Sequence, residues 1–321
     1  MGGMKIAAVI VNRNRPRGTL EAVESLRRGR VVPERIVVVD NGESDPALQA
    51  TFGKIPGIVS IAGGGNHGFG GGNNVALRAF LPEFETFFFL NDDARVMEDT
   101  LLRLTEAISQ APDVGIVGST LLDAADPDRL HAAHGIVNHR QVVACLAGAG
   151  AALPEAPAGP PRAVDFVLGC GMLVKRSVFE RIGLFDAHLF LYHEDLDLCL
   201  RAWRAGFRVL HVPAAKVLHE ISASSRGAEG ERVRAYFLTR NAFLVMDRHG
   251  RFHDWMKFLL FVALDLIVKA PMLFSPGDRG VYLARLSGFA HGFSGGEDPP
   301  FVQRFCAPLP LIRRGIPIPP E

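Results

Sequence analysis

Residues 86–93 read TFFFLNDD, an apolar run that passes directly into an amide and two carboxylates. An earlier stretch, residues 35–42, has the same design and reads RIVVVDNG. Runs this apolar are typical of strands that are buried on both faces of a parallel sheet. Because open α/β folds bind ligands at the carboxyl ends of their strands, the polar residues that end these two runs are candidates for a binding site.

Strand and helix patterns alternate through the first 120 residues. Apolar and β-branched runs predict strands at 4–11, 35–40, 58–62, 86–90 and 115–119, and helical periodicity predicts helices at 18–28, 73–80 and 98–109. Further along, the pattern predicts a strand at 164–175, a helix at 194–205 that Gly206 ends, and a strand at 208–212. This alternation predicts an α/β fold with a mostly parallel sheet between two layers of helices.

Composition places the chain among ordinary globular proteins. Its 321 residues are 48% hydrophobic and 21% charged, which suits one large domain, or one domain plus an appendage. The formal net charge of +1, with Lys and Arg spread along the chain, gives no argument for nucleic acid as a partner. The four cysteines contain no CxxC pair, and residues 4–11 lack the flanks of a secretory signal, so a cytosolic protein is expected.

A glycine-rich stretch follows the third predicted strand. Residues 63–74 read GGGNHGFGGGNN, and so much glycine lets backbone amides come close to a phosphate or a sugar. Asn66, Asn73 and Asn74 favour a polar ligand over a simple flexible loop. The stretch also matches the dinucleotide fingerprint formally, but it follows the wrong strand and lacks the acid expected about 20 residues later. This argues against an NAD-dependent oxidoreductase.

Two acidic clusters carry most of the chemical information. Asn91, Asp92 and Asp93 offer the hard oxygen ligands that Mg²⁺ or Mn²⁺ takes, although acids also cap helices. Glu194 and Asp195 open a predicted helix, where they suit either a general base or the helix dipole.

Two further residues have open assignments. Asp40 suits either a nucleoside contact or a turn with Asn41 and Gly42. His219 is either a structural histidine or, as a neutral imidazole, the nitrogen ligand of a mixed metal site.

Taken together, these motifs resemble the family 2 glycosyltransferases, and among them the rhamnosyltransferase-like group. The resemblance covers about residues 4–250. It rests on Ala8–Asn12, Val38–Asn41, Asn66–Asn74, Leu90–Asp93, Gly169–Val174, Gly183–Asp186, Tyr192–Leu198 with Arg201, His219 with Ser222–Ser225, and Arg240-Asn241. It implies a GT-A domain in residues 1–250, followed by a helical extension with a Pro-rich tail in residues 251–321.

The resemblance also implies a site. Asp195 would be the catalytic base and Glu194 its neighbour that positions the acceptor, while Asp93, Asn91 and His219 would hold Mn²⁺ or Mg²⁺. The candidate donor-binding residues are Asn12, Asp40, Asn66, Gly68, Phe69, Gly72, Asn73 and Asp92. Asn91 stands where the strict DxD motif has an acid, which removes one anionic ligand from the metal site.

The predicted function is therefore that of an inverting glycosyltransferase. The donor would be a nucleotide-diphosphate sugar, with dTDP-rhamnose favoured by the resemblance, and the acceptor a hydroxyl of a glycan or polyprenyl-linked glycan. The product would enter cell-wall or surface polysaccharide at the cytoplasmic face of the membrane. Alternatives are a sugar-nucleotide-binding protein without transfer activity, against which the intact Glu194-Asp195 pair argues, and a nucleotidyltransferase.

The extension has its own pattern. Residues 252–274 are strongly apolar, and Asp254, Lys257, Asp265 and Lys269 fall near one helical face. An amphipathic helix of this kind is typical of a membrane surface, but the same pattern fits a helix packed on the catalytic domain or on a second copy of the chain. A membrane span tolerates the internal Asp and Lys residues poorly.

Overall fold

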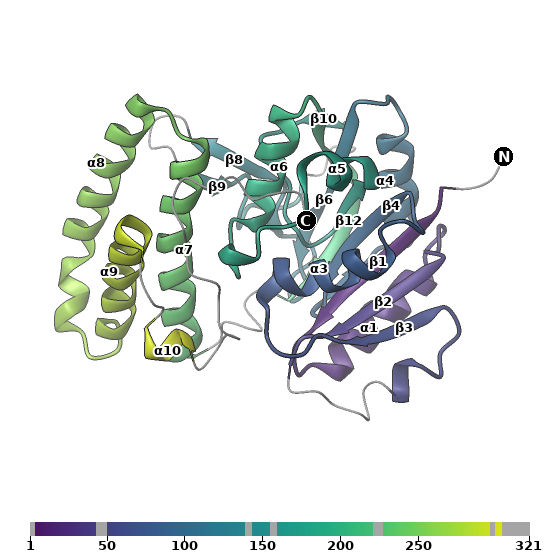
Figure 1. Ribbon diagram of the computed structural model, residues 1–321, viewed down its shortest axis with the longest axis horizontal. Helices are drawn as coiled ribbons and strands as arrows, with labels where there is room; N and C mark the ends of the chain where they lie inside the picture. Colours follow the sequence, from purple (N-terminus) through teal and green to yellow (C-terminus); the bar gives the residue numbers. More distant parts are fainter. Residues whose placement is uncertain are drawn as a thin grey trace.

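The computed structural model describes residues 4–42, 50–138, 143–154, 159–220, 227–295 and 299–303. A 10-stranded sheet forms its centre (Figure 1). In order across the sheet the strands are β10 (Arg162–Ala163), β12 (Arg208–His219), β6 (Val114–Asp123), β11 (Met172–Lys175), β4 (Thr86–Asn91), β1 (Ile6–Asn12), β2 (Arg35–Asp40) and β3 (Ile58–Ala62). Off this path, β5 (Ala94–Val96) pairs with β12 and β7 (Leu130–Ala132) with β6, while β8 (Gly135–Asn138) and β9 (Val143–Leu146) form a separate pair.

Helices cover both faces of the sheet, as predicted. One face packs against α1 (Pro16–Arg27) and α4 (Thr100–Ile108), and the other against α3 (Gly68–Phe80), α5 (Arg176–Ile182) and α6 (Glu194–Arg204). Alternation along β1 divides the two cores, because successive side chains point to opposite faces. Ile6, Ala8 and Ile10 enter the first core, and Ala7 and Val9 enter the second.

The centre of the sheet differs from the prediction. The expected strand at 164–175 begins only at Met172, and β11 runs antiparallel between β4 and β6. The chain turns just before it at Gly171, where φ is +79° and an added Cβ would lie 2.1 Å from Ser119 Oγ. Only glycine fits there, so residues 169–171, which lie inside the predicted strand, form a turn that precedes β11.

Two other boundaries also moved. α3 begins at Gly68 rather than at Asn73, so the second half of the glycine-rich stretch is the first part of a helix. β12 runs on to His219, because Lys216–His219 continues the pairing with β6. The longer strand matters for function, since it delivers His219 to the carboxyl end of the sheet, where β4 also ends.

The C-terminal part is helical and stands beside the sheet (Figure 1). It contains α7 (Ala228–His249), α8 (Phe252–Lys269), the 3-10 helix η2 (Ala270–Phe274), α9 (Arg279–Ser294) and α10 (Pro300–Gln303). None of the helices in the described ranges combines the length and apolar character that crossing a bilayer requires. The predicted Pro-rich tail beyond residue 303 and the Ser222–Ser225 motif lie outside the described residues.

Candidate active site

The three predicted metal ligands meet at the carboxyl end of the sheet. Asn91 ends β4, Asp93 lies between β4 and β5, and His219 ends β12, which pairs with β5. His219 Nε2 lies 3.1 Å from Asp93 Oδ1 and 3.1 Å from Asn91 Nδ2. Strand pairing thus joins residues that are far apart in sequence.

The chemistry of this cluster fits a divalent cation. Among the described residues, Asn91 Oδ1 and Asp93 Oδ1 are buried without a hydrogen-bond partner. His219 Nδ1 contacts His131 Nδ1 at 2.8 Å, and donation from His219 leaves its Nε2 lone pair beside Asp93. The carboxylate and amide oxygens suit Mn²⁺ or Mg²⁺, and the imidazole nitrogen of His219 would complete a mixed oxygen and nitrogen site. In the described part of the chain no three Asp, Glu, His or Cys side chains form a metal cluster, so the amide of Asn91 would have to serve as the third ligand.

The two carboxylates Asp92 and Asp93 have little positive charge close to them. Arg15 NH1 lies 3.9 Å from Asp93 Oδ2, while Arg15 NH2 pairs with Glu220 at 2.8 Å. Asp92 accepts the Arg13 N–H at 2.9 Å, yet burial and then the charge of Asp93 raise the pKa of Asp92 to about 7. A bound cation would favour ionised Asp92. Sequence reasoning missed Arg15 and Glu220, although both follow the ends of strands.

Several of the candidate donor-binding residues lie together in hydrogen-bonded turns next to β2. Asn41 Nδ2 donates to the Gly68 carbonyl at 3.0 Å, and Asn41 Oδ1 accepts the His67 N–H at 2.9 Å. Asn66 Oδ1 accepts the Gly68 N–H at 3.1 Å. Asp40 is buried and accepts the Gly42 N–H at 3.4 Å, which is the turn contact that the sequence allowed as its alternative. Asn41, not counted among the candidates, is thus the residue that organises this turn.

The other candidate donor residues support the junctions between elements. Asn12 Oδ1 accepts from the Arg15 N–H and the Thr19 hydroxyl, which fixes the start of α1. Gly72 packs so closely on β1 that an added Cβ would lie 2.7 Å from Val11 Cγ1. Asn73 donates to the Phe69 carbonyl, and in the described ranges its buried Oδ1 has no hydrogen-bond partner.

Gly68 and Phe69 contact the segment that precedes the acidic pair Glu194-Asp195. Gly68 has a φ of +70°, and an added Cβ would lie 2.1 Å from the Phe190 carbonyl oxygen. The Phe69 N–H donates to that same oxygen at 2.9 Å. The first two amides of α3 are therefore engaged within the protein, and the glycines serve this close contact rather than an open loop.

The acidic pair opens α6. Asp195 Oδ2 accepts the Gly169 N–H at 3.0 Å and Asp195 Oδ1 accepts the Leu196 N–H at 2.8 Å. Glu194 is 6% exposed, and among the described residues its Oε2 has no hydrogen-bond partner. Burial raises the pKa of both carboxyls, and the charge of Asp195 raises the pKa of Glu194 further. The Gly171 N–H bonds to the Phe89 carbonyl at 2.8 Å, so one short segment links Asp195 to β4.

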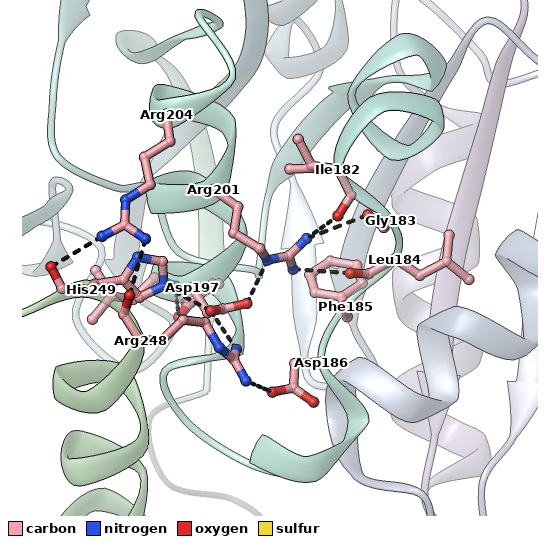
Figure 2. A network of polar contacts seen from close by, with 12 residues as sticks. Ile182, Gly183, Leu184, Phe185, Asp186, Asp197, Arg201, Arg204, Arg248 and His249 are labelled. Carbon is pink, nitrogen blue, oxygen red and sulfur yellow. Dashed lines mark hydrogen bonds and ion pairs between the residues drawn. The ribbon is translucent and has the colours of Figure 1, made fainter. Parts of the chain in front are cut away.

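A buried ionic network anchors α6 (Figure 2). Asp197 accepts from Arg201 Nε at 2.7 Å, from Arg248 NH1 at 2.6 Å and from His249 Nε2 at 2.9 Å. Arg248 NH2 also binds Asp186 at 2.7 Å. These cations hold the pKa of Asp197 well below its usual range despite its burial. Asp197 thus has a structural role, and the sequence did not predict its partners Arg248 and His249.

Comparisons with known proteins agree with this picture. The profile of the family described as "Glycosyltransferase like family 2" matches residues 4–237. An N-acetylglucosaminyl-diphospho-decaprenol L-rhamnosyltransferase of Mycobacterium tuberculosis is 28% identical over 244 residues, which are 68% of this chain and 76% of that protein. Rhamnosyltransferase WbbL of Escherichia coli is 28% identical over 224 residues, 67% of this chain and 83% of that one.

Solved structures give the same fold. The mannosyltransferase PcManGT from Pyrobaculum calidifontis, in complex with GDP-Man and Mn²⁺, aligns with a TM-score of 0.57 at 15% identity. The alignment covers 91% of this chain and 87% of that one. This likeness confirms the predicted GT-A fold.

Proposed function

Because the chain belongs to glycosyltransferase family 2, we propose that it is an inverting enzyme that moves a sugar from a nucleotide-diphosphate sugar to a hydroxyl of a lipid-linked glycan. One observation carries this proposal: Asp195, fixed by the Gly169 N–H, is linked by residues 169–171 to β4, at whose end Asn91 meets Asp93 and His219. Two rhamnosyltransferases among the relatives support rhamnose as the sugar and surface polysaccharide as the product.

Asp195 would act as the general base. It takes the proton of the acceptor hydroxyl while the hydroxyl oxygen attacks the anomeric carbon from the side opposite the diphosphate. The bond from the anomeric carbon to the diphosphate oxygen breaks, and the nucleoside diphosphate leaves with that electron pair. General-base assistance of this kind is worth ~10²–10⁴-fold in rate. The two backbone N–H bonds to Asp195 fix the orientation of its carboxylate.

Asp93, His219 and the amide of Asn91 would hold Mn²⁺ or Mg²⁺. A bound cation supplies positive charge for the departing diphosphate. Arg15, whose guanidinium lies between Asp93 and Glu220, would add charge at the same edge of the sheet.

Asp93→Ala is the sharpest test of this metal site. We expect the variant to bind Mn²⁺ at least about tenfold more weakly than wild type, because it loses the carboxylate that contacts His219. Calorimetry with Mn²⁺ alone, and then with a panel of sugar nucleotides with metal or chelator, measures both steps. Asp99→Ala, which removes a surface partner of Arg103, is the control. Donor binding that chelator does not weaken in wild type would contradict the metal assignment.

We also propose that α8 lies on a lipid surface. Met256, Leu260, Leu264, Ile267 and Val268 are between 52% and 75% exposed, at spacings that place them along one side of the helix. Figure 1 places α8 at the outer edge of the helical part. A large exposed apolar patch marks an interaction site. Arg251 and Lys257, both exposed, offer positive charge to anionic headgroups, and a lipid-linked acceptor would lie at the same surface.

The double variant Leu260→Glu, Leu264→Glu tests this surface. We expect its partitioning onto vesicles that contain anionic lipid to fall at least about tenfold, since charges replace two exposed apolar side chains that would enter the lipid. Val32→Glu, an exposed apolar position in a loop of the sheet domain, is the control. A second copy of the chain is the competing occupant: a dimer that sedimentation detects without lipid, and that the double variant dissociates, would overturn the membrane assignment.

A further inference from the structure

The segment before the acidic pair has an unusual backbone. Among the described residues, the non-glycine residues with positive φ are Asn14, Phe190, Tyr192 and His193. The last three, at +58°, +66° and +70°, directly precede Glu194 and α6. Positive φ is energetically unfavourable for residues that have a Cβ atom. Such residues keep this conformation only when contacts with their surroundings stabilise it.

Helix α7 provides that hold through one buried amide. The Asn241 Nδ2 amine shares its two N–H groups among three carbonyls, those of Leu189 at 2.7 Å, Leu191 at 2.8 Å and Tyr192 at 2.8 Å. Asn241 is 0% exposed, so its side-chain amide makes these contacts away from solvent. The backbone of residues 189–192 therefore curves around a single side chain.

Arg240 fixes the orientation of that amide. Its Nε donates to Asn241 Oδ1 at 3.0 Å, which leaves the amide nitrogen pointing at the three carbonyls. Its NH2 group donates to the His188 carbonyl. The Phe190 carbonyl is taken by the Phe69 N–H of α3. Each carbonyl from residue 188 to residue 192 thus has a partner from α7 or α3.

We propose that Asn241 is a positioning residue for the catalytic step. By gathering the three carbonyls it maintains the left-handed turn, and the turn sets where α6 begins and hence where Asp195 meets the Gly169 N–H. The inference rests on the proposed role of Asp195 as the base. It extends the set of residues that position Asp195 to α7, the helix that carries Asn241.

The test compares Asn241→Leu with wild type. Leucine has a similar shape but no donor. We expect kcat to fall at least about 100-fold, in line with the effect of misplacing a catalytic group, with donor affinity by calorimetry unchanged. Asn241→Gln retains the donor and is expected to recover part of the lost kcat. Thr239→Val removes a side-chain hydrogen bond to the Ala235 carbonyl within the same helix, and should leave kcat unchanged.

The outcomes separate this inference from the proposed function. If Asp195→Asn is inactive but Asn241→Leu keeps the kcat of wild type, the positioning role is wrong and the base assignment stands. If Asp195→Asn transfers sugar like wild type, both fail. If Asn241→Leu does not fold, Asn241→Gln decides: a folded variant with wild-type donor affinity and a reduced kcat supports the role, and equal loss of kcat and donor affinity overturns it.

Discussion

Replacing Asp195 by asparagine should lower sugar transfer by about 10²–10⁴-fold while donor affinity stays the same. Asparagine keeps the shape and an oxygen that accepts the Gly169 N–H, but it cannot take a proton. Release of nucleoside diphosphate measures transfer, and calorimetry measures donor binding. Asp165→Asn is a matched control, since Asp165 likewise accepts a backbone N–H, that of Val137. Transfer by Asp195→Asn at the rate of wild type would exclude Asp195 as the base.

The pH dependence of kcat gives the same prediction a second readout. Burial raises the pKa of Asp195, and the base must be ionised, so kcat should fall as pH is lowered through a value above the ordinary aspartate pKa of about 3.9. Glu194 shares the site and its pKa is raised further, so the pair titrates together. Because the pKa of Glu194 is the higher of the two, Glu194 is already protonated when Asp195 titrates, so Glu194→Gln should leave the acid limb of kcat close to that of wild type.

Local sequence pattern predicted much of the fold for a clear reason. β2 and β3 have the predicted bounds, because each is a short apolar run that a turn or a charged residue ends. Parallel strands expose their carboxyl ends at one edge, which is why the sequence could predict that Asn91 and Asp93 lie at that edge. Both residues contact His219 because β12 extends to the same edge of the sheet.

Other features depend on partners that periodicity does not reveal. An apolar run says that β11 is buried, but not that it inserts antiparallel between β4 and β6. Asn241 and Arg248 lie on α7, where the sequence alone does not show which polar side chains are buried. Their hydrogen-bond partners are a carbonyl and a carboxylate about 50 residues away in the chain. The exposed side of α8 is likewise apolar, whereas its Asp265 pairs with Arg285 of α9 at 3.6 Å.

Arg248→Met should destabilise the protein by about 3–5 kcal/mol, because removing one partner of a buried ion pair leaves uncompensated charge. Asp186 and Asp197 are 2% and 0% exposed, and Arg248 bonds to both (Figure 2). Methionine retains most of the aliphatic length without the charge. Urea denaturation gives the free energy of unfolding. Arg208→Met breaks an exposed two-bond pair with Asp113 and should lower the free energy of unfolding far less, because solvent screens exposed pairs.

At acid pH the free energy of unfolding of Arg248→Met should come closer to that of wild type. The pKa of Asp197 in the folded protein lies below that of an unfolded aspartate, so its contribution to stability is complete at neutral pH. That contribution is lost as pH falls below about 3.9 toward the folded value. A stability difference that shrinks in this pH range would show that charge, and not packing alone, fixes α6 in place. A cost for Arg248→Met that equals that of Arg208→Met, or that does not change with pH, would show that the remaining contacts of Arg201 and His249 with Asp197 suffice.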